Sequence, residues 1–218
     1  MTRRLPDAFW HAIPLHYAPY LLFSGGLLSQ ARLAGANLPI RPRPTAFRRD
    51  RRLHLDDYIH LSLEPQTPLL ADKRGRGYHH LLIEFARGAA DLPGAAFLAY
   101  NTKAWRHRED FAPVAGVEEK AAFLAAWQMG SYPSAELLVP GALPLVPHCR
   151  AFYAASDSEA GWLRDLAAAL LLPLPAPLQT SSERFPPGLI PDLSPYAAYA
   201  AACREACAVL PPPDMPFD

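Results

Sequence analysis

Proline constrains the fold of this chain more than any other residue type. It occurs 25 times in 218 residues, mostly in the connections between elements and in the C-terminal third. Because proline fixes φ and lacks a backbone N–H, it punctuates helices and is kept out of central strands. The chain is therefore expected to form many short elements joined by rigid turns.

Hydrophobic periodicity indicates which short elements these are. Residues 57–63 alternate between a polar face and an apolar face, which is typical of a half-buried strand. Strands are predicted at residues 8–13, 57–63, 78–85, 95–100, 136–139 and 145–154. Helices are predicted at residues 15–23, closed by Gly25 and Gly26, and at 117–128, 157–171, capped by Asp157 or Ser158, and 196–209. Residues 35–52 are expected to form a loop, residues 173–194 a Pro-rich excursion, and the tail from residue 211 to fray. The mixture favours an α+β fold.

Composition fits one enzyme-sized domain. Half of the residues are hydrophobic, enough for one sizeable core over residues 1–218, with a Pro- and Ala-rich C-terminal extension at 173–218. The 21 basic and 21 acidic residues balance, so any nucleic-acid contact must come from a local patch, and residues 41–52 are the dense basic one. Three cysteines are consistent with a reducing cytoplasm. No segment resembles an export signal or a membrane span.

A carboxylate opens one of the predicted strands. Glu136 begins the apolar run in SAELLVP, residues 134–140. An acidic residue there is ordinarily a solvated strand edge or a guard against aggregation. A glutamate could also bind a ribose hydroxyl and stabilise positive charge at a sugar carbon, as carboxylates do in glycosidic-bond cleavage.

Two upstream segments favour the chemical interpretation. WHAIP at residues 10–14 leads through an apolar run to SGGLLS at 24–29, and LDDYIHLSLEPQTPL at 55–69 follows the basic cluster RRDRR at 48–52. In this order, with Glu136 downstream, the segments resemble the DarT family of DNA ADP-ribosyltransferases over residues 9–163. The resemblance implies a split mixed sheet with flanking helices, an NAD co-substrate and no metal.

The resemblance also implies roles for particular residues. Glu136 would be catalytic, assisted by Arg48 or Arg49 against the NAD pyrophosphate, where a guanidinium forms charge-assisted hydrogen bonds. The adjacent arginines cannot be told apart by sequence. The remaining cofactor-binding residues are His11, Ile13, Gly25 and Leu27. A lone histidine in such an apolar setting is otherwise a core or rim residue.

The expected acceptor is an unpaired nucleobase, with single-stranded DNA favoured over RNA. The residues expected to contact it are Arg51, Arg52, Tyr100, Asn101, Lys103, Trp105 and Ser134. Tyr100 and Trp105 could stack on bases. Such an activity would be toxic, so the resemblance implies a toxin or phage-defence effector with a macrodomain-type antitoxin as a possible partner.

Several departures leave alternatives open. Ser134 stands where the family has glutamine or arginine, His60 replaces a proline, and Gln66 with Thr67 replaces an arginine-containing pair. An enzyme of the same fold acting on RNA, protein or a small molecule, a non-enzymatic NAD- or nucleotide-binding module, and a plain interaction domain therefore remain alternatives. Rossmann and phosphate-loop glycine patterns are absent from the sequence.

Overall fold

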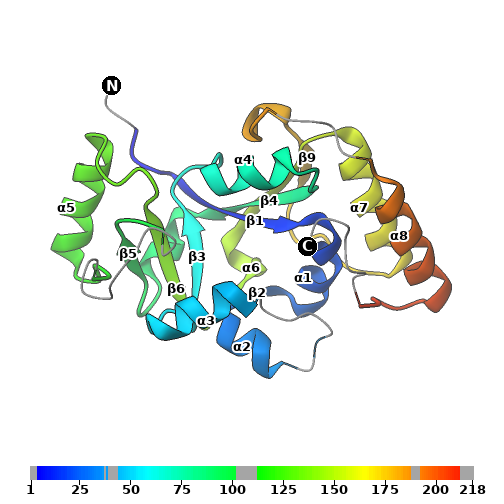
Figure 1. Cartoon of the computed structure of the whole chain (residues 1–218), viewed down its shortest axis with the longest axis horizontal. Coiled ribbons are helices and arrows are strands. Elements are labelled where there is room, and N and C mark those ends of the chain that lie inside the picture. The colour runs from blue at the N-terminus through cyan, green and yellow to red at the C-terminus, as the bar shows by residue number, and fades with distance from the viewer. Residues whose placement is uncertain (1–3, 37, 39–43, 102–111, 188–191, 212–218) are drawn as a thin grey trace.

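A mixed sheet surrounded by helices forms the centre of the computed structural model (Figure 1). The structure describes residues 4–36, 38, 44–101, 112–187 and 192–211. Within these residues the central sheet has seven strands in the spatial order β5-β6-β3-β1-β4-β8-β9. Their bounds are β1 Ala8–Pro14, β3 Tyr58–Ser62, β4 His80–Ala86, β5 Ala96–Leu98, β6 Glu136–Pro140, β8 Cys149–Ala154 and β9 Leu178–Thr180. All neighbours are antiparallel except β8 and β9. The predicted α+β class is confirmed.

The sheet is nearly divided between β1 and β3. These two strands share one registered pair, Trp10 with Ser62, whereas β1 and β4 pair along seven residues. One half of the sheet is therefore β5-β6-β3 and the other is β1-β4-β8-β9. This narrow junction, called the seam below, is the split expected from the sequence.

A small two-stranded sheet lies beside the seam. It consists of β2 Gly26–Leu28 and β7 Ala142–Pro144, paired antiparallel. Gly25 before it has a φ of 70° and ends helix α1 in the left-handed conformation that glycine adopts without steric cost. A Cβ on Gly26 would lie 2.7 Å from the carbonyl oxygen of Leu143, so only glycine allows this close strand approach.

Helices enclose the sheet at its ends and edges. Their bounds are α1 Ala18–Ser24, α2 Gln30–Gly35, α3 Pro44–Arg52, α4 Pro68–Gly75, α5 Val117–Gln128, α6 Leu145–His148, α7 Asp157–Ala169 and α8 Ser194–Ala206, with 3-10 turns η1 Leu15–Tyr17, η2 Arg87–Asp91 and η5 Ser182–Arg184. Helix α5 lies at the end formed by β5 and β6, and α7 and α8 lie at the opposite end (Figure 1).

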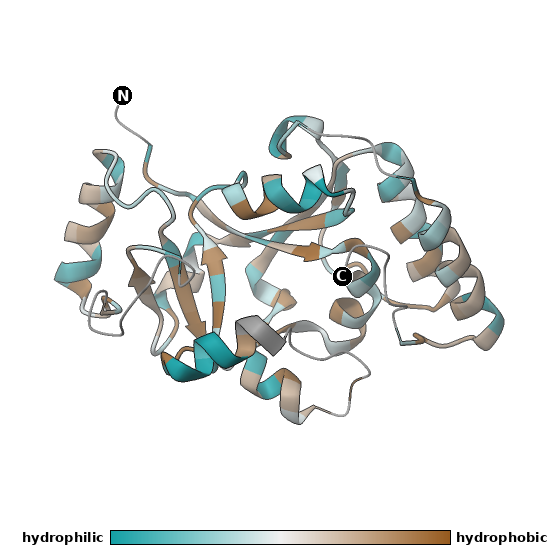
Figure 2. Cartoon of the chain, in the orientation of Figure 1, coloured by the Kyte–Doolittle hydropathy of each residue, from teal (hydrophilic) through white to brown (hydrophobic). Residues whose placement is uncertain are grey.

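The main core runs between the sheet and these helices. Phe9, Leu61, Ile83 and Leu137 from four strands are at most 1% exposed in this core. Hydrophobic residues follow the central strands, whereas the described part of α3 is strongly hydrophilic (Figure 2). Buried Tyr196 and Tyr199 join α8 to the same core. Burial of this apolar area is the main force that holds the layers together.

The predicted loop at residues 35–52 is wrong, because its second half is helix α3. Proline suits the first position of a helix, and Pro44 opens this one. The charged run 48–52 lacks the apolar stripe that usually reveals a helix. Instead, Asp50 is buried and accepts a hydrogen bond from Gln30 of α2, while Leu53 and Leu55 bury the end of the segment. Tertiary contacts hold this helix.

Other boundaries also differ from the sequence prediction. Residues 145–148 form α6 rather than strand, where Pro147 has no N–H to give to a ladder. The N-cap of α7 is Ser156, not Asp157 or Ser158, because Ser156 and Glu159 form a reciprocal capping box. The Pro-rich excursion 173–194 contains β9, a three-residue edge strand, and η5. The last helix ends at Ala206.

Candidate active site

Glu136 lies at the first position of β6, inside the sheet rather than on a solvated edge. In the strand register Glu136 pairs with Ser62 of β3 on one side and with Leu98 of β5 on the other, and the residue is only 7% exposed. A carboxylate placed there pays a desolvation cost unless hydrogen-bond donors surround it. Two side chains provide these donors.

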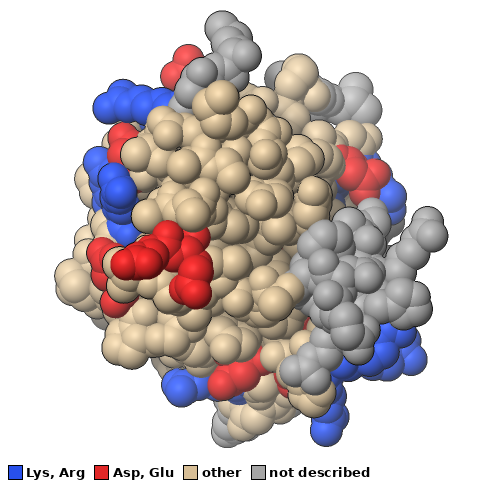
Figure 3. Space-filling view, turned by 90° about the vertical axis from the view of Figure 1, so that its left-hand side faces the viewer, with Lys and Arg blue, Asp and Glu red and all other residues tan. Residues whose placement is uncertain are grey.

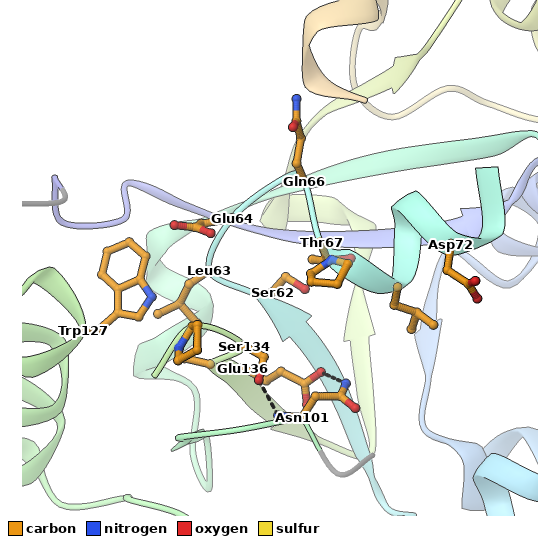
Figure 4. Close-up of a pocket in the computed structure, with 14 residues that line it drawn as sticks. Ser62, Leu63, Glu64, Gln66, Thr67, Asp72, Asn101, Trp127, Ser134 and Glu136 are labelled. Atoms are coloured by element: carbon orange, nitrogen blue, oxygen red, sulfur yellow. Dashed lines mark hydrogen bonds between the residues drawn. The ribbon is translucent and has the colours of Figure 1, made fainter. Parts of the chain in front are cut away.

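His60 and Asn101 hold the two carboxylate oxygens of Glu136 separately. The His60 Nδ1 donates to Oε2 at 2.8 Å, and the Asn101 Nδ2 donates to Oε1 at 2.6 Å. The backbone N–H of Asn101 also donates to the Ser134 Oγ at 3.2 Å, which ties the residue after β5 to the approach of β6 (Figure 4). With one donor on each oxygen, the orientation of the carboxylate is fixed.

His11 reaches across the seam to the same cluster. Its Nδ1 lies 2.8 Å from the carbonyl oxygen of His60. A carbonyl only accepts, so Nδ1 carries the proton and Nε2 is left as an acceptor in the neutral ring. Burial lowers the pKa of His11 to about 4, so the imidazole is neutral at neutral pH.

His60 has the opposite electrostatic tendency. Burial lowers its pKa, but the Glu136 carboxylate, acting through charge and hydrogen bond, outweighs burial and raises the pKa above the ordinary value of 6.5. Asp50 and the Leu55 carbonyl act in the same direction. The contact with Glu136 therefore favours the protonated form of His60.

Two cavities meet at Glu136. The first, the His11 cavity, has a volume of about 350 Å³ and includes His11, Leu27, Arg49, His60 and Lys73 in its lining. The second, the Trp127 cavity, has a volume of about 340 Å³ (Figure 4). Five residues line both cavities: Ser62, Thr67, Leu69, Asn101 and Glu136. Both volumes lie in the range of small-molecule sites.

The Trp127 cavity is the more apolar of the two. Trp127 of α5 and Leu63 lie on one side of it (Figure 4), and Leu69 of α4 is also in its lining. Ser134 and Glu136 are exposed to it from β6 and its approach. No lysine or arginine lines this cavity within the described residues. The arrangement suits an uncharged, flat group better than a phosphate.

The four arginines of α3 have different environments. Arg49 lines the His11 cavity, with its side chain 31% exposed and its Nε 3.7 Å from Asp50. Arg48, Arg51 and Arg52 are exposed and lie outside the lining of both cavities. Lys73 of α4, which the sequence analysis did not select, lines the cavity with Arg49.

The other predicted site residues are only partly brought together. Leu27 lines the His11 cavity, whereas Ile13 packs into the main core and Gly25 caps α1, both outside the two linings. Tyr100 packs edge-on against Tyr132, with ring centroids 5.9 Å apart. Lys103 and Trp105 lie outside the residues that the structure describes.

Besides Lys73, two residues at the site were missed by sequence analysis. His60 was noted only as a departure from a family proline, although the alternation of residues 57–63 already placed it on the polar face of its strand. Trp127 was predicted to lie in a helix, but its place in the lining of a cavity depends on how α5 packs. Asn101, which was expected at the nucleic acid, contacts Glu136 directly.

Two further findings concern metals and membranes. Within the described ranges, no group of three His, Cys, Asp or Glu side chains is arranged to hold a metal ion. Among the same residues, no helix has the length and apolar character needed to cross a membrane.

The fold is that of the DarT-like ADP-ribosyltransferases. Among solved structures, the chain is similar to Thermus sp. 2.9 DarT in complex with ADP-ribosylated single-stranded DNA, with a TM-score of 0.63 and 15% identity, covering 85% of this chain and 99% of that one. The same Thermus protein in complex with NAD+ gives a TM-score of 0.60 at 14% identity, covering 85% and 100%. Thermosipho africanus DarTG in complex with ADP-ribose gives a TM-score of 0.63 at 13% identity, covering 82% of this chain and 51% of that one.

The likeness is one of fold rather than of sequence. No protein-family model matches the chain, and no curated protein matches it. The fold implied by the sequence resemblance is confirmed, and the arguments about chemistry rest on the site.

Proposed function

We propose that the protein is an NAD-dependent ADP-ribosyltransferase that modifies a nucleobase in single-stranded DNA. The observation that carries the proposal is the position of Glu136: its carboxylate is held by two donors in a wall shared by two cavities. A transferase of this kind needs a donor and an acceptor on two sides of one reacting carbon. Solved structures of the same fold, bound to NAD+ and to ADP-ribosylated single-stranded DNA, support this choice.

NAD is assigned to the His11 cavity. Arg49 would face the pyrophosphate, with Lys73 as a second cation on the same lining. Arg48, being exposed, is the weaker of the two arginine candidates. The neutral His11 adds no positive charge beside the cationic nicotinamide ring, and its Nε2 can accept a hydrogen bond from the nicotinamide amide or a ribose hydroxyl.

The reaction follows from that placement. The bond between ribose C1′ and the nicotinamide nitrogen breaks, and its electron pair leaves with nicotinamide. Positive charge spreads over the ribose ring, where the Glu136 carboxylate stabilises it and binds the 2′-hydroxyl. A nitrogen of the acceptor then forms the new bond to C1′ and loses its proton to solvent or to Glu136.

The acceptor base is assigned to the Trp127 cavity. Trp127 and Leu69 give it apolar walls, and Ser134 and Asn101 provide polar groups near Glu136. A base inside a duplex could not enter, so the substrate must be unpaired there. The face that carries α5 has a compact acidic group and few cations near its centre (Figure 3). Among the described residues, the cations proposed to meet backbone phosphates are chiefly Arg51 and Arg52 of α3.

The biological role proposed is that of a toxin or phage-defence effector acting in the cytoplasm, where unpaired DNA occurs. A macrodomain-type antitoxin is the proposed partner, supported by the likeness to a DarTG structure bound to ADP-ribose. The runner-up activity is transfer by the same site to RNA, protein or a small molecule, which the largely apolar lining of the Trp127 cavity also admits.

One experiment separates these possibilities. The protein is incubated with NAD and, in parallel, single-stranded DNA, the matched RNA, and the fully paired duplex, and each product is analysed by mass spectrometry. We expect one added ADP-ribose on the single-stranded DNA. Glu136→Gln is the matched control, because it keeps size and removes charge. Modification of RNA alone would favour the runner-up, and NAD binding without cleavage would favour a binding module.

A further inference from the structure

Among the residues that the structure describes, His60 is the titratable side chain that contacts the Glu136 carboxylate directly. Its Nδ1 lies 2.8 Å from Oε2, and both side chains are largely buried, with exposed fractions of 17% for His60 and 9% for Glu136. The remaining oxygen of Glu136 is occupied by the uncharged Asn101 amide. Within the described residues, His60 is therefore the titratable group best placed to change the electrostatic environment of Glu136.

We propose that His60 is a positioning residue that orients the Glu136 carboxylate and, by gaining or losing its own proton, sets how much negative charge that carboxylate offers to the reacting ribose. The inference deepens the proposed function and rests on it. In the neutral ring, Nδ1–H still donates to Oε2, so orientation is kept in both protonation states. Only the compensating positive charge is lost on deprotonation.

The reaction needs the deprotonated state. A carboxylate paired with an imidazolium stabilises a cationic ribose less than the same carboxylate beside a neutral ring, because the two positive charges repel. Deprotonation of His60 therefore speeds C1′–nicotinamide cleavage. The backbone of His60 is held in place from the other side of the seam, because the His11 ring donates a hydrogen bond to the His60 carbonyl oxygen.

Charged and titratable groups around His60 come from each neighbouring element. They are Glu136 of β6, Asp50 and Arg49 of α3, His11 of β1, Tyr58 of β3, His80 of β4 and Lys73 of α4. Glu136 has the largest raising effect on the pKa of His60, which lies above 6.5. The rate is therefore expected to rise with pH through a midpoint above 6.5.

The matched variant is His60→Asn. The asparagine Nδ2 occupies nearly the place of the histidine Nδ1, so the donor to Oε2 is kept while the titration is removed. We expect NAD cleavage by the wild type to fall by up to tenfold per pH unit below the midpoint, and the variant to keep its plateau rate across the same range. His60→Ala, which loses both the donor and the titration, should be about tenfold to a hundredfold slower than the wild type above the midpoint, in kcat rather than in KM for NAD. His148→Asn, away from the site, should follow the wild type.

A second measurement is independent of turnover. NMR titration of the histidine side chains compares the wild type with Glu136→Gln. We expect the His60 midpoint to fall by about one pH unit or more in the variant, while the His148 midpoint stays unchanged. An unchanged His60 midpoint, or a His60→Asn rate that falls with acid as the wild type does, would overturn the inference. Absence of NAD cleavage by the wild type would overturn the proposed function instead, and the titration would still decide whether the His60 proton depends on Glu136.

Discussion

Replacing Asn101 with aspartate is the sharpest test of the charge balance at Glu136. The Asn101 Nδ2 lies 2.6 Å from Oε1, so the change places a second carboxylate where a donor stood. Two unit charges at that distance repel by about 6 kcal/mol at an effective dielectric constant of about 20. Placing a proton on an ordinary carboxyl with a pKa of about 4 costs about 4 kcal/mol at pH 7. Protonation of one carboxyl costs less than the repulsion between two carboxylates. The carboxyl pair of the variant therefore binds one proton at neutral pH and carries a single negative charge.

Two consequences can be measured. We expect transfer at pH 7 to fall at least tenfold, because part of the charge that stabilises the ribose cation is neutralised. The pair binds its proton more tightly in the folded state than in the unfolded state. Relative to pH 4, the variant should therefore lose stability as pH rises, by about 4 kcal/mol at pH 7 and by up to about 6 kcal/mol once pH passes the folded midpoint.

The assay is denaturant unfolding at pH 5, 6, 7 and 8, read as the difference from the wild type. Asn101→Ala removes the donor without adding charge and should lose about 1.5–3 kcal/mol with little pH dependence. Gln179→Glu adds a carboxylate at an exposed position of β9 and should change little. Equal losses for Asn101→Asp at pH 5 and pH 8, or undiminished transfer at pH 7, would refute the reasoning.

Three further outcomes are expected. Glu136→Ala should reduce transfer by about 10²-fold or more while NAD affinity, measured by calorimetry, stays near that of the wild type; retained turnover would remove Glu136 from the mechanism. Arg49→Ala should weaken NAD binding by about 1.5–3 kcal/mol, Arg49→Lys should rescue it in part, and Arg48→Ala should have a smaller effect; unchanged affinity in the double Ala variant would leave α3 as a solvated helix. Binding of single-stranded DNA should depend weakly on salt, with a log–log slope of about −2 to −3 from the few cations available, and equal modification of duplex DNA would contradict the need for an unpaired base.

Local patterns predicted the elements whose stability is local. The alternation at residues 57–63 gave the strand and its two faces, and the apolar spacing at residues 117–128 gave α5 with its observed bounds, Val117–Gln128. Glu136 was expected at the start of a strand and lies there. Helix α3 could not be found in this way, because what holds it is the buried Asp50 and its contact with Gln30, 20 positions away.

The site itself depends on pairings between distant segments. His60 and Glu136 are 76 positions apart and meet because β3 and β6 pair with Ser62 opposite Glu136. The family resemblance pointed to Glu136, but it also presented His60 as a missing proline. A departure from a pattern reveals nothing about contacts until the register of the strands is known.

The seam between β1 and β3 is the junction of the central sheet with the fewest paired residues. One registered pair and the contact from His11 to the His60 carbonyl span it, while every other strand junction in the central sheet shares at least three pairs. His11 belongs to one side, and Glu136, His60 and Asn101 belong to the other. A ligand that contacts both halves would stabilise the junction between them by its binding free energy. In this architecture, ligand occupancy at the seam and the stability of the junction between the two half-sheets are thermodynamically coupled.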